Sequence, residues 1–86
     1  MDIQHDTDRS TIFTQIDGHT AYVQYEVKDG TFDILHTIVP HPLEGQGIAS
    51  MLVKFAYDYA LTKGWHTATT CSYAAAWMKR HPEYNQ

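Results

Sequence analysis

Two glycines in the stretch Glu44-Gly45-Gln46-Gly47-Ile48-Ala49 stand where an extended segment gives way to a helix. The first backbone N–H groups of a helix have no partners within it, and they carry a partial positive charge. Because glycine has no side chain to cover them, this spacing favours a phosphate cradle. A lone G-x-G before a helix is also common in ordinary turns, so both interpretations stay open.

Cys71 and His36 are the other two residues whose types could do chemistry. Cys71 directly precedes a second expected helix, whose positive end can lower the pKa of a thiol and make it nucleophilic. His36 lies on an expected strand, and its near-neutral ordinary pKa suits it to accept a proton. Each also has a structural interpretation. Cys71 can be a small buried side chain, and His36 can be a hydrogen-bonded core histidine beside Ile34 and Ile38.

The strands that must position these residues form the first half of the chain. Three β-rich runs span residues 11–16, 21–28 and 31–39, separated by Asp17-Gly18 and Asp29-Gly30. Asp-Gly tolerates the positive φ angles of a tight hairpin, so the runs predict a three-stranded antiparallel meander. The polar residues 1–9 add a short strand at most. In the third run, simple alternation places Phe32, Ile34, His36 and Ile38 on one face.

The second half of the chain predicts a crossover helix, a strand and a final helix. Pro40 and Pro42 end the third strand, because neither can donate to a ladder. The helix from about Gly47 to Lys63 carries an apolar stripe at i, i+4, i+7, i+8 and i+11. The stripe consists of Ile48, Leu52, Phe55, Ala56 and Tyr59. Lys63 and Gly64 provide its C-terminus, a basic residue in the last turn and a left-handed cap.

A fourth strand, Trp65 to Thr70, follows the crossover helix, and we expect it to run parallel to the third strand. Ser72 is the expected N-cap of a helix from Tyr73 to Arg80, which Pro82 terminates. The order β-β-β-α-β-α predicts a single α/β domain over residues 1–86.

Composition narrows the classes of partner. The chain has 86 residues, a formal charge of −4 and no basic cluster beyond Lys79-Arg80. We therefore expect neither nucleic acid nor membrane as a partner. One cysteine, no secretory leader pattern and no long apolar run favour the cytoplasm. The remaining histidines have no spacing typical of a metal site, and we expect a monomer or a weak homodimer.

Four blocks in order resemble a known family. They are Leu35-His36-Thr37-Ile38-Val39-Pro40, Leu43 to Ser50, Cys71-Ser72-Tyr73 and Arg80-His81-Pro82-Glu83-Tyr84. Together they resemble the minimal YjdJ-type subfamily of the GNAT superfamily, the acetyl-CoA-dependent N-acetyltransferases. The resemblance covers roughly residues 8 to 84. It implies a minimal GNAT-like fold, in which the third and fourth strands splay apart and the acetyl thioester lies between them.

The resemblance also implies a cofactor site for acetyl-CoA or CoA. The family motif, Gln or Arg, two residues, Gly, one residue, then Gly or Ala, matches Glu44 to Ala49 position by position. It implies that the amides of residues 45–49 hold the pyrophosphate and that the backbone of Ile38 and Val39 bonds the pantetheine arm. Glu44 departs from the favoured Gln or Arg. Because the cradle works through backbone N–H groups, we expect Glu44 to point away and to weaken binding only modestly.

In the catalytic roles that the resemblance implies, His36 is the general base for an amine acceptor, Tyr73 protonates the departing CoA thiolate, and Cys71 faces the acetyl group. Cys71 either carries the acetyl group transiently or only lines the pocket while the amine attacks directly. We therefore expect an N-acetyltransferase acting on an unidentified amine. The alternatives are a non-catalytic acyl-CoA-binding or protein-interaction module and an unrelated phosphate-binding domain.

Overall fold

Two Asp-Gly turns organise the strands in the computed structural model, which describes residues 1–85. The φ angles are 51° and 78° at Asp17 and Gly18, and 52° and 76° at Asp29 and Gly30. This pair of positive angles matches the twist of a tight hairpin. The turns join β2 (Thr11–Ile16), β3 (His19–Lys28) and β4 (Thr31–Ile38). The expected antiparallel meander is therefore confirmed.

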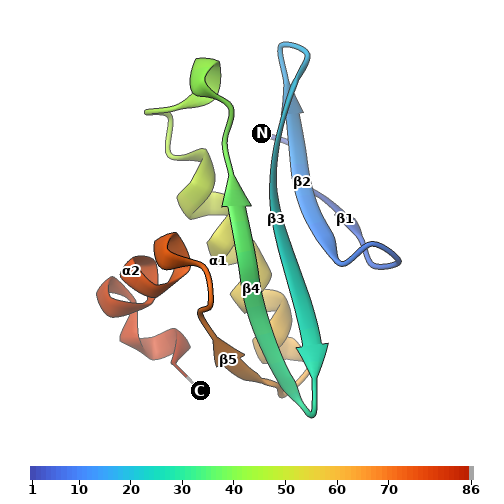
Figure 1. The fold of residues 1–86 in the computed structure, drawn as a ribbon, viewed down its shortest axis with the longest axis vertical. Helices are drawn as coiled ribbons and strands as arrows, with labels where there is room; N and C mark the ends of the chain where they lie inside the picture. Colours follow the sequence, from blue (N-terminus) through green and yellow to red (C-terminus); the bar gives the residue numbers. More distant parts are fainter. Residues whose placement is uncertain (86) are drawn as a thin grey trace.

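Two three-residue strands complete a five-stranded sheet in the order β1-β2-β3-β4-β5. These are β1 (Gln4–Asp6) and β5 (His66–Ala68). The helices are α1 (Ile48–Thr62) and α2 (Ser72–Arg80), and the 3₁₀ turns are η1 (His41–Leu43) and η2 (Pro82–Tyr84). Strand β5 runs parallel to β4 after the α1 crossover, as predicted. Helix α1 lies behind the sheet, while α2 lies beside its β4–β5 edge (Figure 1).

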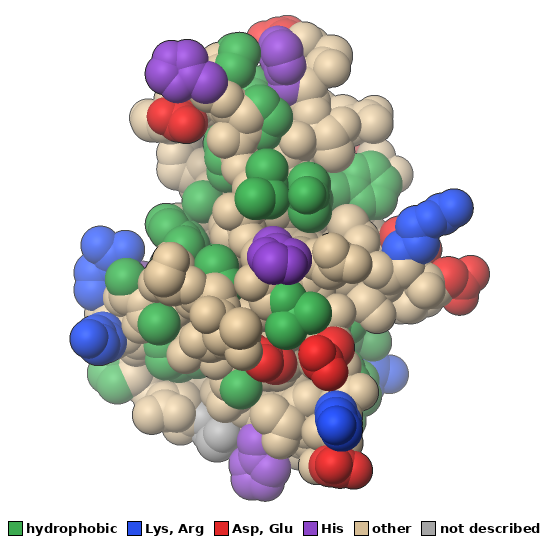
Figure 2. Space-filling view, in the orientation of Figure 1, with side chains coloured by type: hydrophobic (Ala, Val, Ile, Leu, Met, Phe, Trp, Pro, Cys, Tyr) green, Lys and Arg blue, Asp and Glu red, His purple; other side chains and the backbone are tan. Residues whose placement is uncertain are grey.

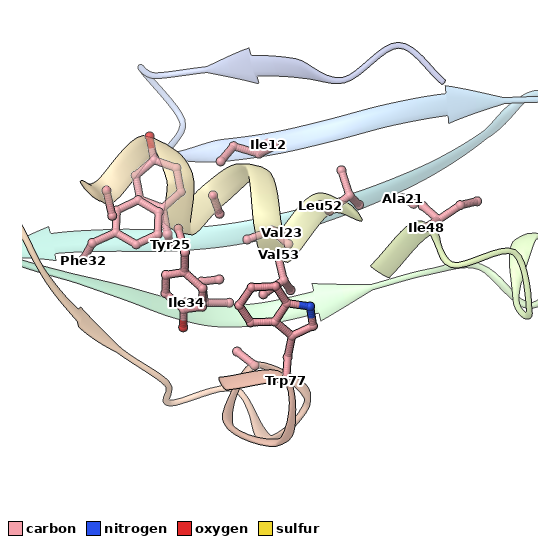
Figure 3. Packing of buried hydrophobic residues seen from close by; sticks show 14 of the residues in the cluster. Ile12, Ala21, Val23, Tyr25, Phe32, Ile34, Ile48, Leu52, Val53 and Trp77 are labelled. Atoms are coloured by element: carbon pink, nitrogen blue, oxygen red, sulfur yellow. The ribbon is translucent and has the colours of Figure 1, made fainter. Parts of the chain in front are cut away.

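The hydrophobic core lies between the sheet and α1, with one large contribution from α2. Ile12, Val23, Phe32 and Ile34 from the strands are fully buried, and so are Leu52, Val53 and Tyr57 from α1. Trp77 reaches from α2 toward Ile34 and Val53 (Figure 3) and is only 1% exposed. The core thus ties α2 to the rest of the domain through one large side chain.

A β-bulge in β4 overturns the predicted alternation of that strand. Tyr25 pairs with Ile34 and Gln24 pairs with His36, so Leu35 is an extra residue without an opposite partner. Before the bulge, Phe32 and Ile34 face the core; after it, His36 and Ile38 are exposed. An extra residue interrupts the period-2 alternation of a strand. The prediction that these four residues share one face, and the core-histidine interpretation of His36, are therefore wrong.

Two helix predictions also need correction. Cys71, with extended backbone, is the N-cap of α2, and Ser72 is its first helical residue. Phe55 is 37% exposed on α1, whereas Ile48, Leu52 and Ala56 of the predicted stripe are buried. The buried surface is turned toward Val53, Tyr57 and Ala60, because α2 and η2 cover the flank of α1 as well.

Candidate functional site

The N-terminus of α1 leaves a run of backbone N–H groups unpaired. Gly45 and Gly47 have φ angles of 81° and 76°, and Gly47 is the N-cap, with no side-chain cap and no acidic residue in the first turn. Within residues 1–85, no N–H group of residues 45–50 donates a hydrogen bond to the protein. Left-handed φ angles at both glycines turn the chain tightly into the helix. These N–H groups and the helix dipole form an arrangement that can hold an anion.

A pocket of about 220 Å³ lies against these N–H groups. Its lining comes from the loop before α1, the first turn of α1, the residue after β4 and the first turn of α2. Of the predicted cofactor residues, the lining includes Val39, Glu44, Gly45, Gly47, Ile48 and Ala49. Ile38 and Gln46 lie outside it. Tyr73 is the one predicted catalytic residue in the lining. The pocket therefore brings together residues from both halves of the chain.

Strand β4 forks away from β5 beside this pocket. The parallel pairing ends at Asp33 and Ala68, and residues 36–38 pair with β3 alone. Beyond the last paired residue, the chain of β5 turns into α2. The edge of β4 that β5 leaves uncovered can therefore offer backbone groups to an extended ligand.

Cys71 lies in this fork, at the N-cap of α2. Its N–H donates to the carbonyl of Ile34 at 2.9 Å, and its thiol donates to the Thr37 hydroxyl at 3.4 Å. The side chain is half-buried. Cys71 and Thr37 are 34 residues apart in sequence, so the sequence alone could not pair them. The structure thus places the only thiol of the chain between β4 and α2.

His36 lies on the sheet face that α1 does not cover. Its side chain is exposed, and none of the described residues forms a hydrogen bond, ion pair or ring contact with it. Phe13, Tyr22 and Ile38 are in register on the same face. Figure 2 shows apolar side chains gathered over the upper and middle part of this face, with histidine among them. His36 is therefore accessible to a partner approaching from outside, without passing through the core.

Glu44 combines two features. Its carboxylate lies 3.5 Å from Nδ1 of His41, a pair that becomes an ion pair when the imidazole is protonated. Both side chains are largely exposed, so the pair contributes little to stability. The residue nevertheless lines the pocket, so its negative charge is still felt by an anion bound there.

Ser50 and Trp77 join the pocket at the start of α1 to α2, and no sequence pattern predicts this link. The indole Nε1–H of Trp77 donates to Ser50 Oγ at 2.9 Å. Ser50 lies in the first turn of α1 and lines the pocket. The hydrogen bond fixes the start of α1 relative to the helix that carries Tyr73, so both walls of the pocket are held by the core.

Residues 1–85 contain neither a set of metal ligands nor a membrane-spanning helix. No group of His, Cys, Asp and Glu side chains there could hold a metal ion. No helix there is both long and apolar enough to cross a bilayer.

Comparisons with known proteins identify the family and the fold. The family model described as GCN5-related N-acetyl-transferase matches residues 11–86. Among solved structures, the chain is similar to a GCN5-like protein from Staphylococcus aureus, determined by NMR in solution. The TM-score is 0.74 at 22% sequence identity, over 96% of this chain and 82% of the other. At that identity the likeness shows the fold, and it confirms the predicted fold class.

Proposed function

Because the chain belongs to the GCN5-related N-acetyltransferase family, we propose that it binds acetyl-CoA at the α1 pocket and transfers the acetyl group to an amine. The observation that carries the proposal is the run of unpaired N–H groups at residues 45–50, which opens on a pocket beside the fork. A phosphate needs the first feature, and an extended thiol-bearing arm needs the second.

The residues present fit such a ligand. No heavy atom lies within 4 Å of a Cβ built on Gly45 or Gly47, so the space over the cradle is open. The amides of residues 45–49 would hold the pyrophosphate, and the backbone of Ile38 and Val39 would bond the pantetheine arm. Glu44 opposes the phosphates electrostatically, but it does not block the N–H groups, because its carboxylate contacts His41.

When bound, acetyl-CoA supplies a thioester carbonyl that an amine can attack. His36, exposed beside the fork on β4, would accept the proton that the amine gives up. Tyr73, in the pocket lining, would donate a proton to the departing thiolate sulfur. Cys71 lies in the fork, where its thiol contacts the Thr37 hydroxyl, and we assign it to the lining of the thioester site. In this assignment the amine attacks the carbonyl directly.

Calorimetric titration with acetyl-CoA, CoA and ATP tests the binding step. We expect both CoA species to bind with a free energy of about −7 to −8 kcal/mol, which corresponds to micromolar affinity. ATP should bind much more weakly, because it has phosphates but no pantetheine arm for the uncovered edge of β4. Failure of both CoA species to bind would overturn the proposal. Equal affinity for ATP would leave only a phosphate site.

A screen of amine acceptors tests the transfer step. With an accepted amine, His36→Ala should lower kcat by about 10²-fold or more, the usual loss when a general base is removed. His19→Ala, an exposed histidine in the β2–β3 hairpin, is the matched control. CoA binding without turnover of any amine would favour the non-catalytic acyl-CoA-binding module.

Intact-mass measurement of Cys71→Ser beside the parent decides the role of the thiol. Acetyl uptake that requires Cys71 would make it a carrier of the acetyl group.

A further inference from the structure

The side chain of Asp33 continues the contact between β4 and the chain after β5, beyond the end of their ladder. Backbone pairing stops at Asp33 and Ala68. Two residues farther on, Thr70 donates its N–H to Asp33 Oδ1 at 2.9 Å and its hydroxyl to Oδ2 at 2.6 Å. Both carboxylate oxygens are therefore used on one residue, in two charge-assisted hydrogen bonds.

The next residue is Cys71. Its N–H is held by the carbonyl of Ile34, the β4 residue after Asp33. The Asp33–Thr70 clamp therefore lies at the point where the ladder between β4 and β5 has ended, and it directly precedes the residue that carries the thiol. A displacement of Thr70 would move Cys71 with it, because the two are covalent neighbours.

The core side of the same segment is fixed independently. Tyr57 of α1, fully buried, donates its hydroxyl to the carbonyl of Ala68 at 2.7 Å. Burial raises the pKa of Tyr57, and the nearby negative charge of Asp33 raises it further. The tyrosine therefore keeps its proton and remains a donor. Tyr57 anchors the end of β5 at Ala68, and Asp33 holds Thr70, the residue between this anchor and the bonds that Cys71 makes to Ile34 and Thr37.

The position of Asp33 is unfavourable for the sheet alone. It lies opposite Glu26 in the β3–β4 register, and like charges directly opposite each other destabilise a sheet. Acidic side chains are visible together on the lower part of this face in Figure 2. A local conflict of this kind is expected where a residue serves the site rather than the fold.

We propose that Asp33 is a positioning residue. Through Thr70 it sets the position of the Cys71 thiol and the opening of the fork between β4 and the chain that follows β5. Its meaning for acetyl transfer rests on the function proposed above. Its effect on the thiol can be measured without any substrate. Because the chain has one cysteine, alkylation by iodoacetamide reports on Cys71 alone.

The first test is the alkylation rate of Cys71 as a function of pH. The limiting rate at high pH belongs to the thiolate, so it is free of any effect of Asp33 charge on the thiol pKa. We expect Asp33→Ala to change this limiting rate by about tenfold, because it removes both charge-assisted hydrogen bonds that hold Thr70. Asp33→Asn should restore it largely, since the amide oxygen can accept from the Thr70 N–H and its NH₂ group can donate to the hydroxyl.

Two further variants keep the test decisive. Glu26→Gln removes the facing carboxylate without touching Thr70, and it should leave the limiting rate unchanged. Thr70→Val removes only the hydroxyl bond, and it should shift the rate in the same direction as Asp33→Ala, by about threefold. Thr70→Val also tests the proposal if Asp33→Ala does not fold. Limiting rates in folded Asp33→Ala and Thr70→Val equal to that of Glu26→Gln would overturn the proposal.

The second test uses acetyl transfer. Asp33→Ala should lower kcat and leave KM for acetyl-CoA and the affinity for CoA near those of the parent, because the cradle at residues 45–50 does not contact Asp33. An equal loss in KM and affinity would show general damage and contradict the positioning role. Should the parent acetylate no amine, the proposed function fails, whereas the alkylation rates still decide the role of Asp33.

Discussion

The two halves of β4 differ in what covers them. Residues 31–33 pair on both sides, with β3 and with β5, and Phe32 is fully buried under α1. Residues 36–38 pair on one side only, and Ile38 is 44% exposed. Ile34 and the bulge residue Leu35 lie between the two halves. The first half of β4 therefore contributes to the hydrophobic core, and the second half has an edge that no strand covers.

This difference suggests how so short a chain contains a site. A domain of about 86 residues buries a modest share of its surface and has little chain to spare for a separate pocket. Here the candidate site begins where the pairing of a central strand stops, and the unpaired N–H groups at the start of α1 follow a few residues later. If β4 is divided in this way, substitutions in its covered half, at the start of α1 and at the far edge of the sheet should have clearly different effects.

Phe32→Ala tests the covered half of β4. The ring of Phe32 stacks on those of Tyr25 and Trp65, with ring centroids 4.4 Å and 6.2 Å apart, respectively. The variant should lower the free energy of unfolding in urea by about 3–5 kcal/mol, because it leaves a cavity in the core. Ile38→Ala, in the open half, should cost less than about 1 kcal/mol. Similar losses at both positions would contradict the division of the strand.

Gly47→Ala tests the cradle that follows the open half. A non-glycine residue at a left-handed φ costs about 1–2 kcal/mol of stability, and the added Cβ would stand in the open space over the N–H groups. We expect about tenfold weaker CoA binding by calorimetry. Gly64→Ala is the matched control, because Gly64 has nearly the same φ, 73°, at the far end of α1. It should lose the same stability and keep CoA affinity.

Glu44→Gln removes the charge that opposes an anion in the pocket. CoA affinity should rise by about threefold at low ionic strength, and the gain should shrink as salt screens the charge. Glu26→Gln, on the same sheet but away from the pocket, should leave the affinity unchanged. Calorimetry at two salt concentrations measures both variants. No gain at low salt would indicate that the His41 contact already neutralises Glu44.

His5 tests the edge of the sheet farthest from the fork. Its Nε2 lies 2.6 Å from the Tyr25 hydroxyl, and burial lowers the pKa of His5 more than Asp6 raises it. The unfolded chain therefore takes up a proton near pH 6.5 more readily than the folded chain. Stability should be full above that pH and fall below it, with a slope under about 1.4 kcal/mol per pH unit. In thermal melts, the stability of His5→Gln should depend less on pH between pH 7.5 and 5.5 than that of the parent. An unchanged slope would show that His5 is not the source of the pH dependence.

Several elements could be predicted because their signals are local. Asp-Gly at 17–18 and 29–30 fixed both hairpins, and the apolar period with Gly64 fixed α1 to within a residue or two. The parallel placement of β5 followed from the handedness of crossovers. The glycines before α1 indicated the anion site for the same reason, since unpaired N–H groups are a property of the backbone there.

The bulge and the clamp could not be predicted. The period-2 pattern through Phe32, Ile34 and Ile38 carries no mark of an inserted residue, because the break depends on where α1 covers the sheet. In the sequence, Asp33 is indistinguishable from an ordinary polar residue of a strand, and its partner Thr70 follows 37 residues later. Ser50 was recognised as part of the helix start, but its hydrogen bond to Trp77 crosses 27 residues.

The amino-acid sequence by itself determined the order of the elements, the turns and the N–H groups at the start of α1, because each depends on φ preferences and periodicity over a few neighbouring residues. Tertiary structure decided that His36 is exposed and that Cys71 meets Thr37. It also decided that Asp33 holds Thr70. These contacts depend on where the pairing of β4 with β5 ends, and strand pairing is a long-range choice that no local segment encodes.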